Sequence, residues 1–208
     1  MQSETVSPLV AERQRRTWTA IHRAAADATL ERGPGDVTVA QIAEIAGVSP
    51  RTFFNYFDSK EDAIVGVQAP HLTDDVLRDL RESTDDPAIL RVCRLVTEVA
   101  RSTIGPGVDM DQRRALAAAH PHLRGRLTAM FGEARKLLMA RLVDDVEPPW
   151  SGIEGLPADP AEARALILLA NGIVTLAWMS DTDRLFTDPD AALAESIDTF
   201  RKVTTTAL

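Results

Sequence analysis

The sequence has 208 residues, a single cysteine and a formal net charge of -8 at pH 7. This length suits one small domain plus one of medium size, and a single cysteine excludes a disulfide bond within the chain. The acidic balance argues against nonspecific coating of nucleic acid. However, residues 1–60 hold equal numbers of basic and acidic side chains, so residues 61–208 carry the entire negative charge. The N-terminus lacks the basic-then-apolar layout of a secretion signal, and we expect a cytoplasmic protein.

Helix signals dominate the chain, and no period-two alternation predicts a sheet. The first helix is expected over residues 10–32, where Trp18, Ile21, Ala25 and Ala28 form an apolar stripe. Gly33, Pro34 and Gly35 then end it.

Residues 38–56 read as two short helices joined by a tight turn. Thr38 and Gln41 stand in capping-box register, which satisfies the first amides of a helix. Gly47 ends that helix, because glycine adopts the left-handed conformation without steric cost. Ser49 and Pro50 then supply a hydroxyl cap and a proline in the first turn of the second helix. This is a helix-turn-helix, a unit that lays its second helix in a DNA major groove.

In the second helix, Phe53 and Phe57 are four residues apart and can pack inward, leaving the polar positions outside. These could form an ordinary solvated face, but their position after the turn favours DNA contact. Arginine can bind guanine and asparagine adenine, while threonine and tyrosine more often reach phosphate or a thymine methyl group. Ser59 with Asp62 predicts a further helix that joins the head to the body. The candidate DNA contacts are Arg15, Arg16, Thr38, Ser49, Pro50, Arg51, Thr52, Phe54, Asn55, Tyr56 and Lys60, the last as a phosphate clamp.

The remaining helices are expected over residues 88–104, 109–119, 121–146, 160–180 and 189–205, with a loop at 147–157. Apolar side chains from this body could line a small-molecule pocket between helices, or they could equally fill a solid core. The candidate ligand-binding residues are Val92, Val96, Arg113, Leu116, Leu127, Met130, Phe131, Trp150 and Trp178.

Residues 160–180 are apolar nearly all round, which predicts a helix covered on every side. A second copy of the chain could cover part of it, or it could be the central helix of a monomeric bundle. The apolar run 165–179 is interrupted by Asn171 and Gly172, so we expect no membrane span. The candidate dimer contacts are Leu166, Leu169, Ile173, Leu176, Ile197 and Phe200.

No constellation suggests catalysis, a cofactor or a metal. His120 and His122 flank a proline, and residues two apart do not share a helical face. Cys93 sits in an apolar helix and is expected to be a small buried hydrophobe. No nucleophile elbow or phosphate loop is present, so we expect no enzyme activity.

The run A-G-V-S-P-R-T-F-F-N-Y-F-D-S-K-E-D-A, residues 46–63, resembles the N-terminal signature of the TetR/AcrR family of bacterial transcriptional regulators. The resemblance covers roughly residues 15–67, and it implies a homodimer joined through two C-terminal helices from each chain. Residues 113–124 more loosely resemble regulators related to the mycofactocin regulator, some of which sense acyl-CoA thioesters. That resemblance would make Arg113, Arg114 and Arg124 anchors for an acidic head group.

Two hypotheses follow. In the first, an all-α chain has a helix-turn-helix DNA-binding domain at residues 10–58 and a helical ligand-binding and dimerisation domain at 59–208. It acts as a repressor that a small hydrophobic ligand releases from a palindromic double-stranded operator. In the second, the chain is a small-molecule-binding or enzymatic helical protein whose N-terminal head does not bind DNA.

Overall fold

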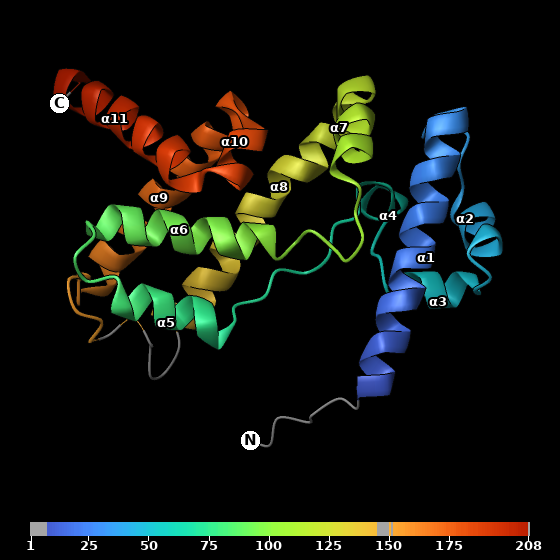
Figure 1. Cartoon of the computed structure of the whole chain (residues 1–208), viewed down its shortest axis with the longest axis horizontal. Helices are drawn as coiled ribbons and strands as arrows, with labels where there is room; N and C mark the ends of the chain where they lie inside the picture. Colours follow the sequence, from blue (N-terminus) through green and yellow to red (C-terminus); the bar gives the residue numbers. More distant parts are fainter. Residues whose placement is uncertain (1–7, 145–149, 151, 208) are drawn as a thin grey trace. The chain divides into compact units, whose positions relative to one another are not determined.

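The computed structural model describes residues 8–144, 150 and 152–207, and every regular element in these residues is helical. This confirms the expected all-α fold; across the same residues the only strand-like feature is an isolated bridge between Val67 and Ile104. In chain order the elements are α1 (Pro8–Arg32), α2 (Val39–Ile45), α3 (Pro50–Phe54), α4 (Lys60–Val65), α5 (Asp74–Glu82), α6 (Ala88–Arg101), α7 (Met110–Ala119), α8 (Pro121–Leu138), the π-helical turn η1 (Met139–Val143), α9 (Pro160–Ser180), α10 (Thr182–Thr187) and α11 (Pro189–Ala207) (Figure 1).

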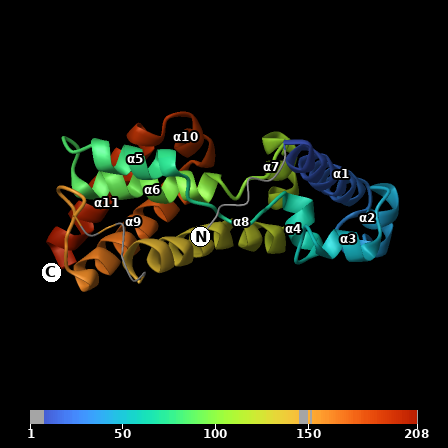
Figure 2. The ribbon, with the colours of Figure 1, turned by 90° about the horizontal axis from the view of Figure 1, so that it is seen from below.

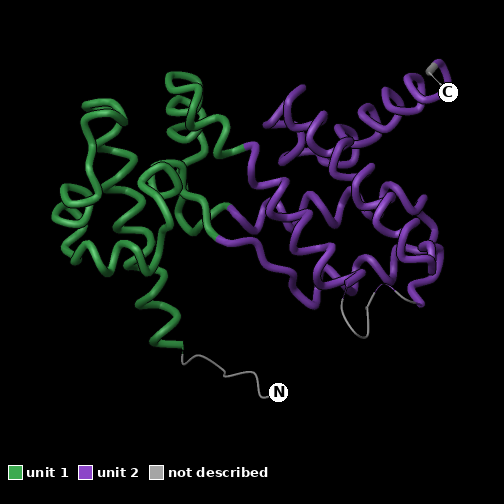
Figure 3. The backbone as a smooth tube through the Cα atoms, turned by 180° about the vertical axis from the view of Figure 1, so that it is seen from behind, with its two compact units in different colours: residues 1–68, 104–127 green, residues 69–103, 128–208 purple. Residues whose placement is uncertain are grey.

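The chain divides into two compact units, coloured separately in Figure 3. Unit 1 comprises residues 1–68 and 104–127, and unit 2 comprises residues 69–103 and 128–208. The boundary expected after residue 58 therefore falls inside unit 1, because α4 and α7 both pack against α1. Helix α8 supplies residues to both units. The functional division at residues 58 and 59 stays a prediction.

Unit 1 is built around aromatic and branched side chains. Trp18 and Ile21 of α1, Phe53 of α3 and Ile64 of α4 are all buried. Phe57, just after α3, places its ring centroid 5.0 Å from that of Trp18 and 5.8 Å from that of Phe53. Aromatic rings at these separations pack favourably, so Phe57 joins α3 to α1, and α3 also packs against α2.

Helix α4 is short, which corrects the expectation that it joins the head to the body. It has six residues and ends at Gly66, whose φ of 66° lies in the left-handed region. A Cβ at Gly66 would lie 2.5 Å from Cγ2 of Val108 and 3.0 Å from Cε1 of His22. Glycine is thus required there both by the backbone conformation and by the close approach of neighbouring side chains.

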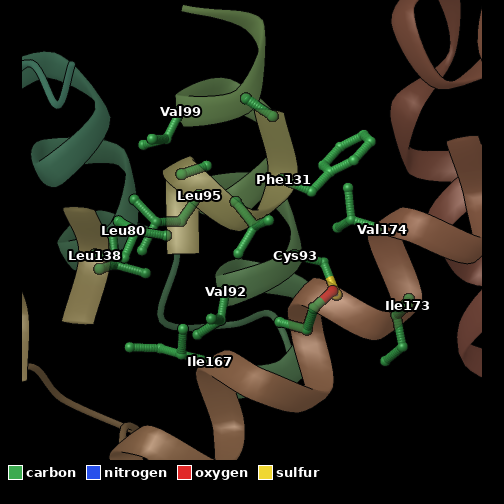
Figure 4. Packing of buried hydrophobic residues seen from close by; sticks show 14 of the residues in the cluster. Leu80, Val92, Cys93, Leu95, Val99, Phe131, Leu138, Ile167, Ile173 and Val174 are labelled. Atoms are coloured by element: carbon green, nitrogen blue, oxygen red, sulfur yellow. The ribbon is translucent and has the colours of Figure 1, made fainter. Parts of the chain in front are cut away.

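In unit 2, α6 packs against α5, α9 and α11, and α9 packs in turn against α10 and α11 (Figure 2). Helix α9 also packs against η1. Apolar side chains from these helices and from α8 form the core. Figure 4 shows Val92, Leu95, Phe131 and Ile167 among the side chains that gather there. The ring of Phe131 meets that of Trp178 edge-on, with the centroids 5.7 Å apart.

Several helix ends differ from expectation. Helix α8 ends at Leu138 and gives way to η1, whereas a helix to residue 146 was predicted. Helix α6 ends at Arg101, three residues early, and α5 and α10 were not predicted at all. The expected loop at 147–157 lies partly outside the described residues. Helix α9 has the predicted bounds, Pro160–Ser180.

By length and composition alone, α9 could cross a membrane, and it is the one such helix in the part of the chain that the structure describes. The apolar run 165–179 lies within this 21-residue helix, and the expectation that it does not span a membrane stays a prediction. The same composition is found in core helices of soluble proteins, so this is weak evidence for a membrane span.

Candidate nucleic-acid interface

Two capped helices and a glycine turn form the helix-turn-helix. The Thr38 hydroxyl accepts the Gln41 amide, and the Gln41 side chain accepts the Thr38 amide at 2.9 Å, a complete capping box. Gly47 has a φ of 68°, which allows the turn. Ser49 caps α3 by accepting the Thr52 amide at 3.0 Å. These contacts are the ones that the sequence predicted.

Helix α3 presents one face to the interior and the other to solvent. Phe53 is fully buried, whereas Arg51 and Asn55 are exposed and Thr52 and Tyr56 are half-buried. Phe54 is 57% exposed and packs edge-on against Phe53, with ring centroids 5.3 Å apart. The exposed face therefore offers a guanidinium, an amide and an aromatic ring, the groups that read base edges or pack on a DNA backbone.

The hydroxyls of Ser49 and Thr52 are already engaged with each other. Their oxygens lie 2.9 Å apart, and Ser49 also accepts the Thr52 amide. Thr38 similarly donates its hydroxyl to Gln41 at 3.0 Å. Pro50 is exposed and has no amide hydrogen to donate. The primary role of Thr38 and Ser49 is thus to hold the ends of α2 and α3.

Lys60 lies in an unexpected setting for a phosphate clamp. Its ammonium donates to the carbonyl oxygens of Pro34 at 2.7 Å and Val37 at 3.0 Å. An ammonium has three N–H bonds, so two are already used within the chain. This geometry favours a role in holding the loop before α2 over direct phosphate contact.

Arg15 and Arg16 are exposed on the first turns of α1, where both pair with Glu12. Their guanidiniums lie 2.6 Å and 2.8 Å from its two carboxylate oxygens. The hydrogen bonds from Arg16 and Arg15 lower the pKa of Glu12. The pairing is solvent-exposed, so either arginine can exchange it for a phosphate at little cost.

The sequence missed an ion pair that connects two helices of unit 1. Arg126 of α8 places its Nε 2.9 Å from Oδ1 of Asp62, and one of its terminal nitrogens contacts the same oxygen. Asp62 is buried, and its other oxygen accepts the Ser59 hydroxyl at 2.5 Å. The partners are 64 residues apart, so no local spacing signals the contact.

The predicted ligand-binding residues fall in both units. Arg113, Leu116 and Leu127 belong to unit 1. The other six belong to unit 2, where Val92, Val96, Met130, Phe131 and Trp150 are buried members of its core and Trp178 packs against it. A groove of about 210 Å³ between α5, α6 and the start of α11 is lined by none of the nine. The alternative of a solid core thus accounts for the five buried residues of unit 2, and a ligand-binding role for the predicted residues stays a prediction.

Arg113 is unusual among the predicted ligand residues because it is a buried cation. It is 4% exposed, and its Nε and one terminal nitrogen have no hydrogen-bond partner in the described residues. Burial lowers the pKa of Arg113 to about 10. Arg114, by contrast, is exposed and pairs with Asp111, and Arg124 is also exposed.

The predicted dimer residues lie on α9 and α11. Leu169 is 41% exposed, and Leu166, Leu176, Ile197 and Phe200 are half-buried. The structure corrects the set at Ile173, which is 1% exposed and belongs to the core of its own chain. Three further apolar side chains on these two helices are exposed: Leu168 at 49%, Met179 at 71% and Val203 at 59%.

Residues 38–57 form a capped helix-turn-helix of the kind found in DNA-binding proteins. Residues 21–64 match the family described as "Bacterial regulatory proteins, tetR family". These residues are therefore a TetR-family N-terminal helix-turn-helix domain, and they make the chain a DNA-binding transcriptional regulator. No curated protein matches the chain.

The family match also concerns the expectations that the protein is soluble and is not an enzyme. Regulators of this family are soluble and typically not enzymes, but the match assigns the N-terminal domain alone. Of the two hypotheses drawn from the sequence, it favours the regulator over the protein whose head does not bind DNA.

Proposed function

We propose that the chain is a transcriptional repressor that binds a pseudo-palindromic operator as a homodimer and is released by a largely apolar small molecule. The observation that carries the DNA-binding part is the orientation of α3. Its buried face is anchored by Phe53, and its exposed face carries Arg51, Phe54 and Asn55. In a dimer, two such helices would enter successive major grooves with half-site centres about 34–36 Å apart.

Arg51 is proposed to read a base, and its substitution tests the DNA-binding surface. Arg51→Ala should cost about 1–3 kcal/mol of binding free energy and relax base preference at one position. The measurement is affinity for a set of single-base operator variants, selected first with the full chain from random DNA. Arg81→Ala, an exposed arginine of α5 in unit 2, removes the same charge and should leave affinity unchanged. A uniform loss across all sequences would make Arg51 a phosphate contact instead.

The dimer is proposed to form through the exposed apolar side chains of α9 and α11. Leu168, Leu169 and Met179 together make an apolar surface on α9 that the described part of the chain leaves open to solvent. Such surfaces mark association sites more often than chance. The two helices also pack on each other, with Gly172 facing the ring of Phe200. A second copy would cover both helices at once.

Leu169→Glu tests this interface, since it puts a charge where association would exclude water. Sedimentation should show a folded monomer, with DNA affinity reduced because two half-sites are no longer bound together. Leu30→Glu is a matched control, because Leu30 is 51% exposed but lies on α1. A dimer that survives Leu169→Glu but dissociates with Leu30→Glu would move the interface to the head.

The effector is proposed to combine an apolar body with an acidic group. Arg113 supports the acidic group, because two nitrogens of its buried guanidinium lack an acceptor, which is costly, and a carboxylate or phosphate would satisfy them. A ligand can release DNA only if it prefers the conformation that does not bind. A coupling free energy of about 1–3 kcal/mol between effector binding and operator binding would weaken operator binding roughly 5- to 150-fold.

Titration of a long-chain acyl-CoA into the DNA complex tests the effector class, with hydrophobic cations titrated in parallel. Release by the acyl-CoA should be weakened by Arg113→Gln and unaffected by Arg114→Gln, which changes an exposed, paired arginine. Release by the cations alone would overturn the acidic group. Release by neither class would leave a constitutive repressor.

A further inference from the structure

The chain passes between its two units at three points, and only one of them lies within a helix. The crossings at residues 68–69 and 103–104 are non-helical, whereas the crossing at residues 127–128 lies in the middle of α8. Helix α8 has 18 residues, a length of about 27 Å at 1.5 Å per residue. A continuous helix can carry a shift or rotation along its axis, which an irregular segment absorbs.

The second half of α8 is embedded in the core of unit 2. Met130, Phe131, Ala134 and Leu138 are all buried there. Phe131 contacts Trp178 of α9 edge-on. Since protein cores are close-packed, a change in the packing of α9 cannot occur without a response from α8.

An ion pair links the first half of α8 to α4. Arg126 holds Oδ1 of Asp62, and the other carboxylate oxygen accepts the Ser59 hydroxyl. The side chain of Asp62 is 7% exposed and that of Arg126 is 46% exposed. A pair with one buried partner is more sensitive to loss of the other partner than a surface pair is.

The first turn of α4 in turn holds the elements around α3. Lys60 donates to the carbonyls of Pro34 and Val37 in the loop before α2. Nδ1 of His22 in α1 lies 2.8 Å from the carbonyl oxygen of Ala63. Only Asn55 to Asp58 separate α3 from the Ser59 cap, and the Phe57 ring within this short link packs against Phe53 of α3 and Trp18 of α1.

We propose that Arg126 is a positioning residue for DNA binding: through Asp62 it fixes α4 and hence α3, so that α8 carries changes in the packing of unit 2 to the recognition helix. This inference rests on the proposed use of α3 to bind DNA. It assigns the coupling to α8 because α4 ends at Gly66 within unit 1.

The first test is the operator affinity of Arg126→Gln, measured with the full chain over a range of salt concentrations. We expect affinity to fall about 2- to 30-fold, the salt dependence to stay unchanged, and Arg126→Lys to restore part of the loss. Lys136→Gln removes the same charge from the same helix and breaks an exposed pair with Glu133, and it should have no effect. A flatter salt dependence for Arg126→Gln would show that Arg126 contacts phosphate and would overturn the proposal.

The second test asks whether unit 2 acts through this pair. Trp178→Leu removes the ring that meets Phe131, and we expect it to change operator affinity several-fold in the otherwise unaltered chain. Combined with Arg126→Gln, its effect should shrink to within about twofold, the margin for independent sites. If Trp178→Leu does not fold, the same measurement is made with Trp178→Phe.

The outcomes separate this proposal from the use of α3 on DNA. Effects of Trp178→Leu and Arg126→Gln that simply add, or no effect of either tryptophan substitution, would overturn the route through α8. If Arg51→Ala still weakened binding in that case, DNA binding by α3 would stand. If Arg51→Ala had no effect either, both would fail.

Discussion

Gly66 offers a direct test of how tightly unit 1 is packed behind the recognition helix. Its φ of 66° is one that alanine adopts at a cost of about 1–2 kcal/mol. A Cβ there would also lie 2.5 Å from Cγ2 of Val108, too close without a shift of the neighbours. Overpacking of a filled core adds roughly 1–3 kcal/mol. Gly66→Ala should therefore lower the free energy of unfolding by about 2–5 kcal/mol.

Gly47 is the matched control, because it separates the backbone cost from the packing cost. Its φ is 68°, but a Cβ at this position would meet nothing within 4 Å. Gly47→Ala should consequently lose only the backbone term, about 1–2 kcal/mol. The difference between the two variants isolates the contact of Gly66 with Val108 and His22.

Urea unfolding followed by tryptophan fluorescence measures both losses. Trp150 and Trp178 would be replaced by phenylalanine in all variants, so that Trp18 of unit 1 is the one reporter. An equal loss for Gly66→Ala and Gly47→Ala would refute the close packing behind α4. A smaller loss for Gly66→Ala would also contradict the left-handed end of α4.

Two further predictions follow from buried titratable groups. Burial lowers the pKa of His22, so the folded state binds fewer protons than the unfolded state, and stability should fall as the pH drops below about 6.5. Thermal unfolding of His22→Gln should show a weaker pH dependence between pH 7 and 5, and an unchanged dependence would contradict the burial. Burial raises the pKa of Cys93 to about 12, so iodoacetamide at pH 8 should alkylate this thiol only after unit 2 opens. Rapid labelling of the native protein, measured by mass spectrometry, would show that the thiol is accessible.

The parts of the candidate site that the sequence predicted are those set by local spacing. Thr38 with Gln41, Ser49 with the Thr52 amide, and Phe53 with Phe57 are contacts over three or four residues. Helix caps and i, i+4 pairs depend on backbone geometry that is the same in every helix, so a single sequence is enough to place them.

Contacts between distant segments were beyond prediction. Lys60 reaches the carbonyls of Pro34 and Val37, 26 and 23 residues away, and Arg126 reaches Asp62 across 64 residues. The sequence shows a lysine and an arginine in helical segments but not what lies opposite them. It therefore assigned Lys60 to phosphate and gave Arg126 no role, although both hold the first turn of α4.

Helix α9 shows why composition could not assign its faces. Its buried face combines three alanines with three branched side chains: Ala163, Ile167, Ala170, Ile173, Val174 and Ala177. Leu168, Leu169 and Met179 point outward. Size does not separate the two faces, because Ile167 and Ile173 are buried while Leu168 and Leu169 are exposed, and a helix that is apolar nearly all round gave no sign that Ile173 lies inside. A helix that leaves three large apolar side chains exposed has an apolar surface left to bury, which is the physical basis for proposing a second copy there.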